Sequence, residues 1–224
     1  MSVLATSTAW SQVPSLLFPA LEQTAAMVGI VMCIVVALGL PLGVLIFNTS
    51  PRGLASHQGL HAAVSWIANL GRSLPFLVLM ATVIPLTELV VGTTIGIKAA
   101  IIPMSLAGIP FFARLVENAI REIPPARLDV GIASGASRLQ VIRRIQLTEA
   151  LPGIVAGLAL NIIAMIEYSA IAGAIGAGGL GYLAVNYGYE QFDSHIMISC
   201  IVVLVLIVQI VQFGGDRIVR SLTH

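Results

Sequence analysis

A run of 23 residues from Ala25 to Phe47 contains no charged side chain. Because an α-helix rises about 1.5 Å per residue, a helix of this length can cross the roughly 30 Å hydrocarbon layer of a membrane. Further long apolar runs follow, and the 224-residue chain is 58% hydrophobic and only 9% charged. Soluble domains carry roughly 25% charged residues. The sequence therefore predicts an all-α, polytopic helical membrane protein, with a single transmembrane domain over residues 1–224.

Five transmembrane helices are expected. After Ala25–Phe47, they are placed at about His61–Ile84, Thr94–Ala119, Leu151–Ala172 and Ile196–Phe213. A turn between the second and third helices is expected at Pro85, Thr87, Glu88 and Gly92. Irregular backbone exposed to lipid leaves its polar groups without partners. The glycine-rich segment Gly173–Gly181 is therefore expected either to emerge from the membrane or to be buried in protein, and Asn186–Ser194 is expected to be a polar segment.

The stretch Ala113–Pro152 differs from its apolar neighbours, because it holds six of the eleven Lys and Arg residues and four of the ten acids. Pro124-Pro125 ends the preceding helix, since proline lacks an N–H and restricts the residue before it. A short helix is then expected from about Ala126 to Ser134. Gly135 suits the position that ends this helix, and Ser137 suits the N-cap of the next. A short helix held between such breaks at a membrane surface is typical of a docking element.

This stretch resembles the cytoplasmic loop of ABC importer permeases, whose motif is Glu-Ala-Ala, three residues, Gly, nine residues and Ile-x-Leu-Pro. At that spacing the chain has Asp129-Val130-Gly131, then Gly135, then Ile145-Gln146-Leu147-Thr148, with Asp for Glu, Val-Gly for Ala-Ala and Thr for Pro. Two more stretches, Glu167–Tyr189 and Phe213–Arg220, are similar to the methionine-uptake branch of that family. The resemblance covers about residues 20–224. It implies the type I ABC importer permease fold, with a cytoplasmic coupling loop at about residues 120–148.

The resemblance also implies a function and partners. The chain is expected to be a permease subunit in a bacterial inner membrane, forming the pathway for an amino acid, in the first place methionine, as a homodimer. No Walker motif is found, so ATP and Mg²⁺ are expected on two partner ATPase subunits, and the chain is expected to be no enzyme and to bind no cofactor or metal. An extracytoplasmic binding protein or lipoprotein would deliver the ligand, membrane lipid would surround the helices, and no nucleic acid is expected. The residues expected to couple to the ATPase are Leu128, Asp129, Ile132, Ala133, Gly135, Ser137 and Arg138.

In this interpretation Asp129 orients the docking helix, and Leu128 and Ile132 fill a cleft of the ATPase. Gly135 allows the turn that follows. Arg138, together with Arg143 and Arg144, holds the loop near the ATPase and the lipid headgroups.

Glu167 lies about sixteen residues into the fourth expected helix, near the middle of the membrane. An ionisable group at that depth costs several kcal/mol unless it is paired or hydrated, so it marks a functional site by default. Glu167 either receives the α-amino group of a substrate, pairs structurally with Arg72, or lies near the outer interface. Related methionine permeases often have a small residue here, which leaves the substrate open. The residues expected to line the pathway are Asn161, Met165, Glu167, Tyr168, Ser169, Asn69 and Arg72.

An ion-coupled secondary amino-acid transporter that uses Glu167 as its ion site is the alternative function. Such carriers usually have more spans and an internal repeat, which this sequence lacks. An intramembrane enzyme would need a nucleophile–base set or metal ligands within the spans, and no convincing set is found there.

The distribution of basic residues predicts the topology. With the coupling loop in the cytoplasm, nine Lys and Arg residues lie inside and only Lys98 lies near the outer side. Because basic residues concentrate in cytoplasmic loops, the N-terminus is expected outside and the C-terminus inside.

Cysteine labelling tests this topology. In a background that lacks Cys33 and Cys200, cysteines introduced at Ser7 and Ser221 should react with an impermeant thiol reagent from opposite faces of the membrane. Labelling of both positions from the same face would mean an even number of spans.

Overall fold

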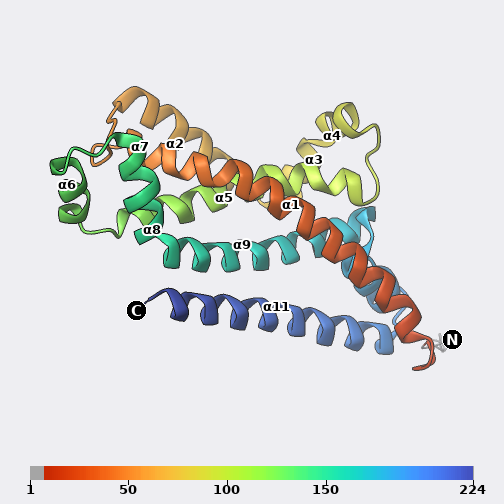
Figure 1. Ribbon diagram of the computed structural model, residues 1–224. Coiled ribbons are helices and arrows are strands. Elements are labelled where there is room, and N and C mark those ends of the chain that lie inside the picture. The colour runs from red at the N-terminus through yellow and green to blue at the C-terminus, as the bar shows by residue number, and fades with distance from the viewer. Residues whose placement is uncertain (1–7, 224) are drawn as a thin grey trace. The chain divides into compact units, whose positions relative to one another are not determined.

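The computed structural model describes residues 8–223, and the elements of this range are helices joined by short connections (Figure 1). Ser7, the proposed labelling site, lies outside the described residues. The α-helices are α1 (Val13–Thr49), α2 (Gln58–Ser73), α3 (Phe76–Thr82), α4 (Ile84–Val91), α5 (Ile97–Arg121), α6 (Pro125–Ala133), α7 (Arg138–Val141), α8 (Leu147–Glu149), α9 (Leu151–Ala172), α10 (Gly179–Tyr182) and α11 (Ser194–Leu222). Three π-helical segments complete them: η1 (Ile142–Gln146), η2 (Gly173–Ala177) and η3 (Leu183–Glu190).

Four helices of the described range are long and apolar enough to cross a membrane: α1, α5, α9 with η2, and α11. A fifth span is obtained if α2 and α3 are counted as one broken span. The five spans expected from the sequence are therefore supported, and the predicted bounds of the fourth, Leu151–Ala172, are those of α9.

The prediction of one continuous helix over His61–Ile84 is wrong. Pro75 precedes α3 with ψ of 138°, an extended conformation, and α2 has already ended at Ser73. A proline without an N–H, which also disfavours helical geometry at Leu74, explains this break.

The turn expected at Pro85, Thr87 and Glu88 is also wrong, because these residues lie in α4. A proline is tolerated in the first turn of a helix, where its missing N–H would have no intrahelical partner. Gly92 then ends α4 with a φ of +75°, in the left-handed region that glycine adopts without strain.

The chain divides into two compact units. Unit 1 comprises the described parts of Met1–Cys33, Leu74–Ala107 and Ile162–Val211, and unit 2 those of Ile34–Ser73, Gly108–Asn161 and Gln212–His224.

Unit 1 holds the glycine-rich segment. Its glycines at 179 and 181 are buried in protein, which agrees with the second of the two expectations, burial in protein rather than emergence from the membrane. Two side chains of α1 accept hydrogen bonds at the start of α10: Gln23 from the N–H of Gly179 at 2.8 Å, and Thr24 from the N–H of Leu180 at 2.9 Å. A Cβ on Gly181 would lie 2.2 Å from the carbonyl oxygen of Ala170, so only glycine fits there. The polar segment expected at Asn186–Ser194 is partly helical, since η3 extends to Glu190.

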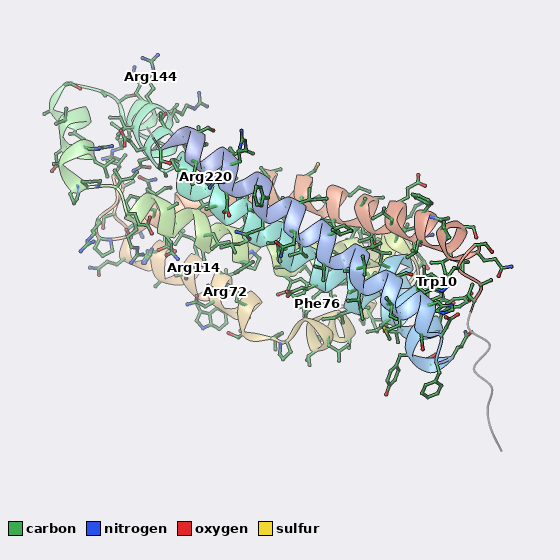
Figure 2. The ribbon with its side chains drawn as sticks, turned by 90° about the horizontal axis from the view of Figure 1, so that it is seen from below. Trp10, Arg72, Phe76, Arg114, Arg144 and Arg220 are labelled. Carbon is green, nitrogen blue, oxygen red and sulfur yellow. The ribbon has the colours of Figure 1, made fainter. Side chains whose placement is uncertain are left out.

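Asp193 anchors the described N-terminal end of the chain to the start of α11. Its carboxylate accepts hydrogen bonds from the backbone N–H (2.8 Å) and hydroxyl (2.5 Å) of Thr8, and from the N–H groups of His195 and Ile196. Burial raises the pKa of Asp193, but these hydrogen bonds outweigh it and hold the pKa below its ordinary value. The ring of His195 stacks on Trp10 at 4.2 Å, and Figure 2 shows Trp10 at this end of α1.

In unit 2, α1, α2 and α5 pack around a core of Ile46, Ala68 and Ala113. A Cβ on Gly43 would lie 2.4 Å from the carbonyl oxygen of Ala113, so glycine allows α1 to approach the backbone of α5. Small residues at such crossings let membrane helices approach closely.

A buried carboxylate organises the contact between α5 and α2. Glu117 has 1% of its side chain exposed and pairs with Arg114, at 16% exposure, and with Arg121, at 51%. Arg114 also donates hydrogen bonds to the carbonyl oxygen of Ser65 at 2.9 Å and to Oδ1 of Asn69 at 3.0 Å. Arg114 therefore bonds to groups of both α5 and α2, whereas the ion pair of Arg121 is with Glu117 of its own helix.

This difference predicts unequal effects for two similar substitutions. Arg114→Met leaves a buried carboxylate with one exposed partner and removes the link to α2, so we expect a loss of roughly 3 kcal/mol of stability. Arg121→Met removes a largely exposed partner of the same carboxylate and should cost under about 1 kcal/mol. Thermal unfolding of both variants in detergent measures the difference. Equal shifts would contradict the assigned role of Arg114.

Candidate functional site

The short helix predicted at about Ala126–Ser134 is confirmed as α6, Pro125–Ala133, within one residue of the expected bounds. Its N-cap is Pro124 and its first residue is Pro125. Leu128 is buried, with 7% of its surface exposed, whereas Ile132 is 52% exposed and Val130 is 69% exposed. The outward apolar side chains of α6 are therefore Ile132 and Val130, while Leu128 packs within this chain.

The structure also bears out the two predicted end signals. Gly135 has φ of +80°, and its N–H donates to the carbonyl oxygen of Ile132 at 3.0 Å. Ser137 caps α7 in a capping box: its hydroxyl accepts from the N–H of Gln140, and the Gln140 side chain accepts from the N–H of Ser137 at 2.8 Å. Capping on both sides fixes the short connection that contains Gly135.

A hollow of about 410 Å³ lies beside α6 in unit 2. The loop after α1 forms one wall with Arg52, and the α6–α7 segment contributes Asp129 and Arg138. Arg127 pairs with Glu149, the last residue of α8, which ties α6 to the end of α8. Arg143 and Arg144 are exposed, and Figure 2 shows the Arg144 side chain projecting away from the ribbon. Ala133 is exposed as well, so the residues expected to couple to the ATPase, other than Leu128, are accessible on this loop.

Among the expected pathway residues, Asn161, Asn69 and Arg72 lie in unit 2. Asn161 is fully buried, and its Nδ2 donates to the carbonyl oxygen of Gly108 at 3.2 Å. Asn69 accepts the hydrogen bond from Arg114 described above. The guanidinium of Arg72 lies 5.8 Å from the ring centroid of Phe111, a distance typical of a cation–π contact.

The other expected pathway residues lie on α9 in unit 1, and their environments differ. Met165 and Ser169 are buried, and the Ser169 hydroxyl donates to the carbonyl oxygen of Ile166 at 2.7 Å. Tyr168 stacks on Phe76 of α3 with 4.3 Å between ring centroids and 7° between planes.

Glu167 is exposed. It lines a groove of about 280 Å³ with Ile166, Ala170, Leu204, Val205, Val208 and Gln209, so one carboxylate and one amide lie in an apolar wall formed by α9 and α11.

The sequence analysis missed one buried polar contact of the loop, which joins Gln146 to Asn48. Gln146 stands at the variable position of the Ile-x-Leu-Pro motif, where the resemblance assigns no role. A polar residue between two apolar ones, shortly before a membrane span, was the available signal. Over residues 8–223, no group of three or more His, Cys, Asp or Glu side chains is placed to hold a metal ion.

Comparison with known proteins relates this geometry to one family. A family model described as "Binding-protein-dependent transport system inner membrane component" matches residues 39–224. The probable D-methionine transport system permease protein MetI of Vibrio cholerae is 44% identical over 209 residues, covering 93% of each chain. The D-methionine transport system permease protein MetI of Escherichia coli K12 is 42% identical over 187 residues, covering 84% of this chain and 86% of that protein.

Solved structures agree. A chain of the MetNI methionine ABC transporter in an inward-facing conformation superposes with a TM-score of 0.93 at 40% identity, over 97% of this chain and all of that one. A chain of an amino acid ABC transporter solved with histidines shares the fold, with a TM-score of 0.77 at 17% identity over 94% of this chain and 96% of that one. The chain therefore belongs to the family of binding-protein-dependent transport system inner membrane components.

Proposed function

We propose that this chain is the permease subunit of an ABC importer that takes up methionine across a bacterial inner membrane. The observation that carries the proposal is the likeness to the MetNI chain, at 40% identity over nearly the full length of both. The agreement of α6, Gly135 and Ser137 with the expected coupling loop supports the same assignment.

The proposed assembly contains two copies of this chain, two ATPase subunits and an extracytoplasmic binding protein. Each ATPase would receive one α6, with Val130 and Ile132 as apolar contacts and Asp129 and Arg138 as charged ones. ATP and Mg²⁺ bind to the ATPase subunits, whose closure on ATP moves the loops. The two permease copies would alternate between inward-open and outward-open states, so that ATP hydrolysis drives import. The N-terminus of each copy lies outside and the C-terminus lies in the cytoplasm.

The geometry of the loop predicts the effect of two substitutions. Asp129→Arg reverses the charge beside Arg52 and Arg138. Gly135→Pro is incompatible with a φ of +80° and removes the N–H that bonds to Ile132. Both variants should accumulate in the membrane but lose co-purification of the ATPase, or lose uptake.

The matched control is Gly92→Pro, which places the same backbone conflict at the end of α4, where the N–H of Gly92 bonds to the carbonyl oxygen of Glu88. It should keep the ATPase. Normal uptake by both loop variants would show that the loop has been assigned wrongly.

Glu167 is proposed to face the pathway and to contact the substrate, in keeping with its exposure in an apolar groove. Glu167→Gln keeps the size and the hydrogen-bonding capacity and removes the charge. Abundance and ATPase association should persist, while uptake or the preference among L- and D-amino acids changes. Glu190→Gln, at another exposed carboxylate of unit 1, is the control and should have no effect.

A structural pair with Arg72 gives a different result. Each single variant, Glu167→Gln or Arg72→Gln, would then strand one charge within the membrane and reduce abundance, and the double variant would partly restore it. Normal uptake by an abundant Glu167→Gln protein would contradict both accounts.

A further inference from the structure

Asn48 and Gln146, 98 positions apart in the chain, form a reciprocal amide pair in unit 2. Nδ2 of Asn48 donates to Oε1 of Gln146 at 2.9 Å, and Nε2 of Gln146 donates to Oδ1 of Asn48 at 3.0 Å. Asn48 is 6% exposed and Gln146 is fully buried. Nδ2 of Asn48 also donates to the carbonyl oxygen of Val44 at 2.9 Å, so both of its hydrogens have acceptors. The pair is thus a directional contact between the end of α1 and the end of η1.

On the loop side, Gln146 is closely connected to the docking helix. It is the last residue of η1, and its neighbour Ile145 packs against Gly131 of α6. A Cβ on Gly131 would lie 2.4 Å from Cδ1 of Ile145, so the backbone of α6 rests directly on this side chain. Well-packed contacts of this kind pass a displacement on, because there is no free volume to absorb it. A π-helical turn at such a place is frequent at functional sites.

On the other side, Asn48 belongs to a rigid end of α1. Its carbonyl oxygen accepts a hydrogen bond from the N–H of Ala55 at 3.0 Å, and the carbonyl oxygen of Thr49 accepts one from His57 at 3.0 Å. A Cβ on Gly53 would lie 2.2 Å from the same carbonyl oxygen of Asn48, so the loop folds tightly onto the helix end. The loop after α1 and the last turn of α1 therefore form one body around Asn48.

We infer that the Asn48–Gln146 pair transmits the movement of α6 to α1 during transport. The two amides are positioning residues: neither is expected to touch the substrate or ATP, and the pair makes α1 follow the docking loop. The inference rests on the proposed function, because it requires an ATPase that moves α6.

The double variant Asn48→Leu, Gln146→Met separates this role from mere packing. Both polar groups are removed together, so neither is left buried without a partner, and the side chains stay similar in size. In proteoliposomes with the ATPase and the binding protein, the variant should keep ATPase association and hydrolysis. Methionine imported per ATP hydrolysed should fall about tenfold, within the usual range of coupling between sites.

The exchange variant Asn48→Gln, Gln146→Asn keeps a complementary amide pair but swaps the longer and the shorter side chain between the two positions. It should recover much of the lost import per ATP, and this readout remains available if the apolar variant does not accumulate. Thr87→Val is the control: it removes a buried hydroxyl that bonds locally, to the carbonyl oxygen of Val83 at the N-cap of α4, and should leave the ratio unchanged.

Three results would overturn the inference: normal import per ATP in the apolar variant, loss of ATPase association together with import, or no recovery in an abundant exchange variant. Failure of the proposed function is distinguishable, because the unaltered chain would then lack ATPase association or methionine uptake from the start.

Discussion

The hydrocarbon of a membrane offers no hydrogen-bond partner, so a helix interrupted there needs specific groups of the protein to bond its free backbone groups. The glycine-rich turn shows this clearly. Its carbonyl at Gly176 accepts from the N–H of Gly96, while Gln23 and Thr24 accept from the N–H groups that open α10. Long apolar helices form easily in lipid, so the residues that determine this particular fold are those at which the helices end.

The same constraint governs the buried polar side chains of unit 2. Glu117 is buried but bonded to two arginines, and Asn48 and Gln146 satisfy one another. A buried polar group without a partner is costly, whereas a complete pair defines one relative position of its two segments. These contacts hold α1, α2 and η1 in unit 2 where apolar packing alone would allow sliding.

Local signals explain why parts of the fold were predictable. Pro124, Pro125, Gly135 and Ser137 act on their immediate neighbours, so the bounds of α6 and the cap of α7 could be predicted from sequence. The break at Pro75 was missed because a single proline is often tolerated in a membrane helix, although the polar residues Arg72 and Ser73 stand just before it. The helix α4 was missed because the proline in its first turn favours a helix start as much as a turn.

Non-local contacts were beyond that kind of reasoning. Nothing in the order of residues joins Asn48 to Gln146, and the direction of Leu128 depends on what packs beside α6. Glu167 is intermediate: its unusual depth in a span was evident, but its groove with Gln209 requires the arrangement of α9 and α11. The candidate site was therefore predictable as a set of residues on one loop and one helix, and not as a set of contacts.

The segment from α6 to Gln146 can transmit a movement only if it is stiff from the exposed face of α6 to the buried side chain of Gln146. Val130 and Ile132 are exposed on α6, and the glycine between them rests on Ile145, beside the buried amide of Gln146. The capping box at Ser137 and the pair between Arg127 and Glu149 restrain the rest of the segment. Because the path from a partner contact to α1 crosses so few residues, a displacement imposed at α6 has little slack in which to be lost. Closely packed interfaces change by discrete shifts rather than by gradual deformation, which suits a transporter that alternates between two states.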